Sequence, residues 1–267
     1  HLSAKDVQLI YGLSFDAEID GMAGATAVSL YALSISMHMM ALGTTSAQMA
    51  AVSVKNHGHA KANPNAHKPM DLSIDDVLTS PNVSTPYRRL DCSLISDGAA
   101  AIVLAHPDHA PASPTPRSRI VGSGAATDHA RLGDRAEPHV FDAKARAARD
   151  AYAMAGIDDP ASEINVAEIY DAFTGAEIQG LEALGLANPG WAGPALLDGA
   201  YTADGPLPVN LSGGLIGQGG APGAVGVMQA VNMDRMLTGR SEMASGRDFR
   251  LGVVDAHGGI CTSSAVH

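Results

Sequence analysis

The stretch from Pro208 to Gly226 constrains the fold of this chain more strongly than any other. Its sequence is PVNLSGGLIGQGGAPGAVG, in which a short apolar run enters a loop that carries seven glycines. Chains concentrate glycine where the backbone must adopt a positive φ or approach a ligand closely. Pro222 then fits the first turn of a helix-compatible run that continues to Leu237. The stretch therefore predicts a strand, a ligand-facing glycine loop and a helix in succession.

Segments typical of strands and helices alternate along much of the chain, which predicts an α/β layered fold. Several helix-like runs are preceded by Ser or Thr and followed by Gly, the residues preferred at helix starts and ends. We expect helices over residues 24–41, 46–59, 74–78, 142–155, 174–184 and 222–237. We expect strands over residues 7–12, 98–106, 119–122, 164–170, 208–211, 249–256 and 261–267. The run 98–106 is continuously apolar, as in a strand buried on both faces.

Residues 107–118 hold four prolines and form the clearest linker in the chain. This linker predicts two parts, residues 1–112 and residues 117–267, with the strand and helix pattern restarting in the second.

The formal net charge is −11, which argues against a nucleic-acid-binding surface. Two cysteines, Cys92 and Cys261, are too few for a disulfide framework and indicate a reducing compartment. No apolar run approaches the length of a membrane span, and no signal peptide is visible. We therefore expect a cytoplasmic protein.

Four segments in a fixed order resemble thiolases of the sterol-carrier-protein and lipid-transfer type. The glycine-rich stretch is similar to the C-terminal signature of the thiolase superfamily, with Asn210 and Ser212 among its matching positions and Gly220 in place of the family's histidine. The other segments are VKNHGHAKANPNAH (54–67), SPNVSTPYRRLDCSLISDGAAAIVLA (80–105) and EIYDAFTGAEIQGLEALGL (168–186). The resemblance implies a fold of two similar βαβαβαββ halves, the first of them incomplete in this chain. Residues 1–112 would be the remainder of that half with its helical insertion, and 117–267 the complete second half.

The resemblance also implies that the nucleophilic cysteine of thiolases lies outside this sequence, because 7–12 matches the fourth strand of the first half. Cys92 occupies a position where the family carries a structural cysteine, so we interpret it as a buried small hydrophobe. Cys261 is out of register with the family's proton-transferring cysteine, whose position is taken by Ala256. We interpret Cys261 as a packed strand residue.

Tyr170 and Asp171 stand where the family has a His-Asp or Asn-Glu pair that stabilises an oxyanion on the thioester. A phenol can donate such a hydrogen bond or act as acid or base, and a Y-D-x-F motif resembles thiolase-like retro-aldolases. His257 lies next to the family's cysteine position, where an imidazole could transfer protons. We expect Tyr170, Asp171 and His257 to form the catalytic set, although a half-buried Tyr170 at a strand end and a solvent-facing turn histidine remain the simpler alternatives.

Contacts to substrate and coenzyme A are expected from Ser212, Gly219, Gly220, Gly223 and His57. The backbone N–H groups of the glycines can bind anionic or carbonyl oxygens near the start of a helix. The spacing of His57, His59 and His67 is not completed by a carboxylate or thiol pattern typical of zinc sites. We expect no metal and no covalently bound cofactor, with a coenzyme A thioester as substrate.

Three functions stay open at this point. The favoured one is an acyl-CoA enzyme that breaks a carbon–carbon bond of a β-hydroxyacyl-CoA by retro-aldol cleavage. The alternatives are a thiolytic acetyl- or acyl-CoA acyltransferase whose nucleophile lies in a preceding segment, and a non-catalytic subunit that binds acyl-CoA or lipid. The resemblance further implies a homodimer or higher oligomer, and association with a small zinc-ribbon and OB-fold partner subunit.

Overall fold

The structure, a computed structural model, describes residue 6 and residues 10–12, 14–16, 18–110, 112–244 and 246–267. Its centre is a four-stranded sheet in the order β3-β6-β5-β4. The strands are β3 (Gly124–Thr127), β4 (Val166–Glu168), β5 (Gly252–Gly258) and β6 (Ser263–Val266). β6 runs antiparallel to β3 and β5, whereas β4 runs parallel to β5. The sheet is therefore mixed, with a parallel edge at β4.

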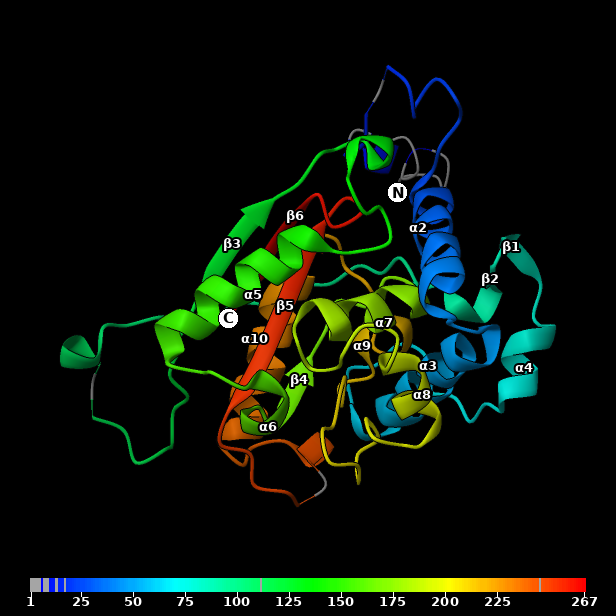
Figure 1. The fold of residues 1–267 in the computed structure, drawn as a ribbon. Coiled ribbons are helices and arrows are strands. Elements are labelled where there is room, and N and C mark those ends of the chain that lie inside the picture. The colour runs from blue at the N-terminus through cyan, green and yellow to red at the C-terminus, as the bar shows by residue number, and fades with distance from the viewer. Residues whose placement is uncertain (1–5, 7–9, 13, 17, 111, 245) are drawn as a thin grey trace.

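The sheet lies between two helices, α5 (Asp142–Ala155) and α10 (Val225–Leu237), as Figure 1 shows. α5 packs on β3 and β6, and α10 packs chiefly on β5. The approach of β3 to α5 requires a residue without a side chain: a Cβ at Gly124 would lie 1.9 Å from the carbonyl oxygen of Ala147. This close contact fixes the position of the sheet against its covering helix.

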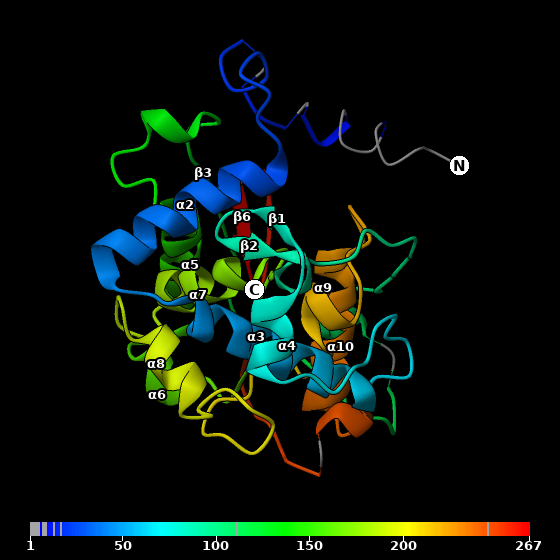
Figure 2. The same ribbon diagram turned by 90° about the vertical axis from the view of Figure 1, so that its right-hand side faces the viewer.

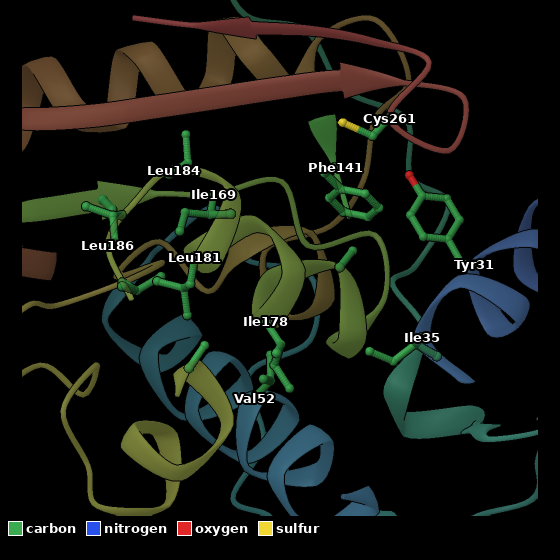
Figure 3. Close-up of a cluster of buried hydrophobic side chains, with 14 of the residues drawn as sticks. Tyr31, Ile35, Val52, Phe141, Ile169, Ile178, Leu181, Leu184, Leu186 and Cys261 are labelled. Carbon is green, nitrogen blue, oxygen red and sulfur yellow. The ribbon is translucent and has the colours of Figure 1, made fainter. Parts of the chain in front are cut away.

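Most of the other helices gather beside the sheet (Figure 2). They are α2 (Ala27–Leu42), α3 (Ser46–His59), α4 (Ile74–Thr79), α6 (Pro160–Glu163), α7 (Thr174–Ala183), α8 (Ala192–Leu197) and α9 (Gly214–Gly217). A small hairpin, β1 (Asn82–Ser84) and β2 (Tyr87–Arg88), contacts α2, and short 3₁₀ turns span Ala60–Ala62, Arg89–Asp91, Pro107–His109, Leu132–Asp134 and Glu242–Ala244. The main core joins these helices to the sheet: Ile178 and Leu181 of α7 lie between Val52 of α3 and Ile169 after β4 (Figure 3).

The predicted helix boundaries agree closely with the structure at most caps, although α2 begins at Ala27 and not at residue 24 as predicted. Thr26, Thr45 and Ser73 each cap a helix start by accepting a hydrogen bond from the backbone three residues on. Gly43 and Gly156 end α2 and α5 in the left-handed conformation. These signals act within one helical turn, so the sequence predicts them well.

The prediction of a buried strand over 98–106 is wrong. The segment has no regular secondary structure and is largely exposed, with Val103 96% and Leu104 69% accessible. A strand that is apolar on both sides needs hydrogen-bonded neighbours and two covering layers, and no described strand pairs with this one. Its apolar side chains are therefore left on the surface of the chain as described.

Three other strand predictions need correction. Residues 10–12 are helical, and residues 7–9 of the same predicted strand lie outside the described residues. Residues 119–122 precede β3 rather than forming a strand, and 208–211 makes a single parallel bridge from Val209 to Ala167. The mixed α/β class is nevertheless confirmed.

The division of the chain into two parts at residues 112–117 stays a prediction. Among the described residues, none of the helices has the length and apolar character needed to cross a membrane.

Candidate active site

Two cavities meet at Tyr170. The large cavity, about 860 Å³, lies among α10, β5, β6 and the segment 118–121. The small cavity, about 230 Å³, lies among α2, the segment 92–95 and the glycine-rich stretch. Tyr170 and Val225 line both cavities, so these two side chains form part of the wall of each.

Tyr170 follows β4, at the carboxyl end of the parallel edge, where α/β folds commonly place functional groups. Its backbone N–H donates to Oδ1 of Asp255 on β5, at 2.9 Å. Burial, followed by electrostatic interactions with Tyr11, Asp171 and Asp255, raises the pKa of the phenol well above its usual value. Tyr170 is therefore a protonated hydroxyl at neutral pH, able to donate a proton or a hydrogen bond.

His257 lies beside Tyr170, with 4.3 Å between the ring centroids. It belongs to β5, lines the large cavity and is 8% exposed, so the alternative of a solvent-facing turn histidine is wrong. Burial, followed by the positive charges of Lys144 and Arg135, lowers the pKa of the imidazole well below its usual value. The structure thus brings together a protonated phenol and a neutral imidazole.

Asp171 has a different environment from Tyr170, because it is fully buried and does not line either cavity. Its carboxylate accepts the backbone N–H groups of Leu215 at 2.6 Å and Ile216 at 3.3 Å. A Cβ at Gly214, which has a φ of 57°, would lie 2.2 Å from Oδ2 of Asp171. The glycine therefore lets the loop close on the carboxylate, and Asp171 holds the loop in place.

Ser212 also points into the protein. Its Oγ donates to Oε2 of Glu168 at 2.5 Å, and its backbone N–H donates to Oε1 at 3.0 Å. Burial raises the pKa of Glu168 to about 7, against the opposing effects of the Ser212 hydrogen bonds and of Lys55. Nζ of Lys55 lies 3.0 Å from Oε1 of Glu177. The buried Lys55 cation therefore interacts with both Glu177 and Glu168, two buried carboxyl groups beneath the loop.

The raised pKa of Glu168 predicts a pH-dependent stability. A folded-state pKa of about 7 against 4.5 means that the folded protein binds this proton more tightly than the unfolded chain. The stabilisation, about 3 kcal/mol, is complete below pH 4.5 and is lost as the pH rises through 7. Between pH 4.5 and pH 7, the free energy of unfolding of Glu168→Gln should fall by about 3 kcal/mol less than that of the parent, as measured by urea unfolding at both pH values. The exposed Glu137→Gln serves as control, and parallel pH profiles for Glu168→Gln and the parent would contradict the prediction.

The remaining predicted contact residues divide into two groups. Gly220 lines the small cavity and Gly223 lines the large one. Gly219 and His57 are buried and line neither cavity. A Cβ at Gly219 would lie 2.6 Å from Oγ of Ser96, and Nδ1 of His57 contacts the carbonyl oxygen of Lys68 at 2.7 Å. Gly219 and His57 thus shape the loop and its support in this structure.

The two cysteines are poor nucleophiles where they lie. Burial raises the pKa of Cys92, in the wall of the small cavity, to about 12. Burial likewise raises the pKa of Cys261 to about 11. Cys261 lies in the turn before β6 with a φ of 52°, and not within a strand as predicted. Both side chains are thiols rather than thiolates at neutral pH.

Sequence reasoning missed most of the aromatic wall of the small cavity. Four aromatic side chains besides Tyr170 line it: Tyr11, Phe15, Tyr31 and Phe173. Tyr31 and Phe173 lie 4.8 Å apart between ring centroids. The F in the segment EIYDAFTGAE could have indicated Phe173, but nothing in the sequence brings Tyr31 of α2 to this place.

His57, His59 and His67 do not converge. Their Nδ1 atoms contact the Lys68 carbonyl, the Asn210 carbonyl and the Ser96 hydroxyl, respectively. Within the part of the chain that the structure describes, no three His, Cys, Asp or Glu side chains form a group able to hold a metal ion.

The chain matches the family described as "Thiolase C-terminal domain-like" over residues 124–267, more than half of its length. It is 37% identical, over 94% of its own length, to an acetyl-CoA acetyltransferase of Methanothermobacter thermautotrophicus. It is 34% identical, over 76% of its length, to sterol carrier protein 2 of Bos taurus, of which it covers 38%. A solved structure described as "Ltp2-ChsH2(DUF35) aldolase" superposes with a TM-score of 0.78 at 24% identity, covering 100% of this chain and 68% of that one.

The chain spans 65% of the length of the archaeal acetyltransferase. The ordered motifs, the mixed sheet with its glycine-rich loop and the match over residues 124–267 agree with one another. The chain belongs to the thiolase superfamily, among relatives of the sterol-carrier-protein type.

Proposed function

We propose that this protein is an acyl-CoA enzyme that cleaves a carbon–carbon bond of a β-hydroxyacyl-CoA by a retro-aldol reaction. The observation that carries the proposal is the pair of Tyr170 and His257 at 4.3 Å, where two cavities meet. At neutral pH the phenol is protonated and can donate a hydrogen bond, and the imidazole is neutral and can accept a proton. Retro-aldol cleavage needs one group of each kind and no thiolate nucleophile.

In this reaction the neutral imidazole of His257 accepts the proton of the β-hydroxyl group. The Cα–Cβ bond breaks, its electron pair passes to Cα, and the β-carbon leaves as the carbonyl group of an aldehyde or ketone. The resulting enolate of the shortened acyl-CoA is stabilised by a hydrogen bond from the Tyr170 hydroxyl to the thioester oxygen. Proton return to Cα then gives the shortened acyl-CoA, so atoms and charge balance without a cofactor.

The surrounding residues support this role for Tyr170. Gly220 and Gly223 bring loop backbone to the walls of the two cavities. Three other residues of the predicted site do not line either cavity and instead hold the loop through buried contacts: Asp171, Ser212 and Gly219. His57, on α3, contacts the carbonyl oxygen of Lys68 and lines neither cavity.

Product analysis tests the proposal and separates it from its rivals. A panel of β-hydroxyacyl-CoA thioesters is incubated with the purified protein, with and without free coenzyme A. Retro-aldol cleavage releases a shortened acyl-CoA and a carbonyl compound without added coenzyme A. Turnover of 3-ketoacyl-CoA that requires coenzyme A would instead indicate a thiolytic acyltransferase, which the 37% identity to an acetyltransferase favours. Binding of acyl-CoA without turnover of either class would indicate a non-catalytic subunit.

We also infer that the protein works as an assembly. Val103 is 96% exposed, and Ile102, Leu104, Ile120 and Val121, which line the large cavity, are exposed as well. Exposed apolar side chains of this kind favour an interaction surface. A homo-oligomer is the first expectation, and the similarity to the structure described as "Ltp2-ChsH2(DUF35) aldolase" favours a second subunit as well. Light scattering on the purified protein that gives the mass of one chain would contradict the homo-oligomer. The zinc-ribbon and OB-fold partner and the cytoplasmic location stay predictions.

A further inference from the structure

His257 has a neighbour that none of the sequence motifs indicates, Tyr31. Tyr31 lies on α2, 226 positions away in the sequence, and its Oη atom is 2.5 Å from Nε2 of His257. The same oxygen lies 2.8 Å from the carbonyl oxygen of Gly259. Figure 3 shows the ring reaching from α2 toward the turn that holds Cys261. Tyr31 is 3% exposed and His257 is 8% exposed, so water does not readily replace these contacts.

The hydrogen-bond geometry determines where the protons are. Tyr31 has one hydroxyl proton, and the Gly259 carbonyl can only accept. When Tyr31 donates to Gly259, its oxygen accepts the N–H of His257, so Nε2 carries the imidazole proton. In the opposite arrangement Tyr31 donates to Nε2, the Gly259 carbonyl loses this donor, and Nδ1 carries a proton.

The second nitrogen decides between the two arrangements. Nδ1 of His257 is buried and has no hydrogen-bond partner among the described residues. A buried N–H without an acceptor is rarer and costlier than a buried acceptor without a donor. The first arrangement leaves a lone pair of Nδ1 without a hydrogen-bond donor, whereas the second leaves an N–H at Nδ1 without an acceptor. The contacts of Tyr31 therefore favour the tautomer with the proton on Nε2.

The imidazole is also held in place by its packing. The Tyr170 ring lies 4.3 Å from it and the Phe141 ring 5.6 Å, centroid to centroid. These contacts support the ring from two sides but leave the choice of tautomer open. Among the described residues, the hydroxyl of Tyr31 is the group that contacts one ring nitrogen and not the other.

We propose that Tyr31 is a positioning residue that fixes the Nε2–H tautomer of His257 and leaves Nδ1 unprotonated. Its consequence for catalysis rests on the proposed function, in which His257 is the base. The tautomer itself does not depend on any activity. Tyr31 acts through His257 and is not assigned a contact with the reacting atoms.

Nitrogen-15 NMR of the histidine-labelled protein tests the tautomer directly. Long-range ¹H–¹⁵N spectra distinguish a protonated from an unprotonated ring nitrogen, and His257→Gln identifies the His257 signals by their loss. We expect a neutral ring with Nε2 protonated and Nδ1 unprotonated. A wild-type spectrum with the proton on Nδ1 would overturn the proposal, whatever the behaviour of any variant.

Tyr31→Phe keeps the ring and removes the hydroxyl. We expect the ¹⁵N shifts of His257 to move toward an average of the two tautomers, since neither nitrogen then has the Tyr31 oxygen as partner. Unchanged shifts in this variant would show that Tyr31 does not set the tautomer. Tyr152→Phe is the matched control, because it also removes a hydroxyl that donates to a backbone carbonyl, that of Leu184 at 2.9 Å, but lies away from His257. It should lose a similar amount of stability without moving the His257 signals.

Steady-state kinetics test the consequence of the tautomer for catalysis. Where the protein cleaves β-hydroxyacyl-CoA, Tyr31→Phe should lower kcat by about 10²-fold with KM little changed, because a misdirected base affects the step and not the binding. An equal kcat in Tyr31→Phe and wild type would overturn the positioning role. Absence of cleavage in the wild type would overturn the proposed function alone, since the NMR result still decides the tautomer.

Discussion

Tyr170→Phe is expected to lower kcat for cleavage of a β-hydroxyacyl-CoA by about 10²- to 10⁴-fold, the usual contribution of a positioned acid or base. The substitution removes the protonated hydroxyl but keeps the ring that packs 4.3 Å from His257. The enolate formed on cleavage would then lose its hydrogen-bond donor. Because the donor is needed most as negative charge develops, kcat should fall much more than KM rises.

Steady-state kinetics with the substrate found in the product panel measure this effect. Tyr201→Phe is a suitable control, because Tyr201 is also a buried tyrosine but lines neither cavity. Its kcat should stay close to that of the parent. A Tyr170→Phe variant with unchanged turnover would remove Tyr170 from the mechanism, and one with only a raised KM would make it a binding residue.

Lys144→Met is expected to lower the free energy of unfolding by about 3–5 kcal/mol, the typical cost of breaking a buried ion pair. Nζ of Lys144 pairs with Oδ2 of Asp255, and both side chains are completely buried. Methionine leaves the Asp255 carboxylate without its cation. Because Oδ1 of Asp255 accepts the backbone N–H of Tyr170, the damage should extend to the candidate active site.

Urea unfolding of a double-mutant cycle measures the pair. Lys144→Met combined with Asp255→Asn should recover much of the lost stability, since the amide is uncharged and its oxygen can still accept from Tyr170. Lys61→Met is the surface control: its pair with Asp71 is exposed, with side chains 52% and 84% accessible, and should contribute less than about 1 kcal/mol. A cost as small for Lys144→Met as for Lys61→Met would contradict the prediction.

The helices could be predicted well because their signals are local. The threonine before α3 and the glycines after α2 and α5 act within one turn of the backbone. The strands were harder. Residues 98–106 have the composition of a buried strand, yet composition does not say whether a neighbouring strand is there to pair with them.

The candidate site shows the same division. The motifs indicated Tyr170 and Gly220, and both line the small cavity. They also indicated Asp171 and Ser212, which are both buried. Asp171 binds the backbone of the loop, and Ser212 binds Glu168. A motif marks the residues that a site needs, but it does not separate those that meet a ligand from those that hold the backbone in place.

The sequence by itself therefore determined the superfamily, the mixed α/β class, most helix boundaries and the unusual Gly220 in the signature loop. These follow from short-range physical preferences and from ordered motifs along the chain. Only the tertiary structure decided that Tyr170 and His257 lie side by side, that burial shifts their pKa values in opposite directions, and that Tyr31 contacts His257 from 226 positions away. The physical reason is that burial, charge and hydrogen-bond partners arise when distant segments pack together, and no local pattern in the chain encodes them.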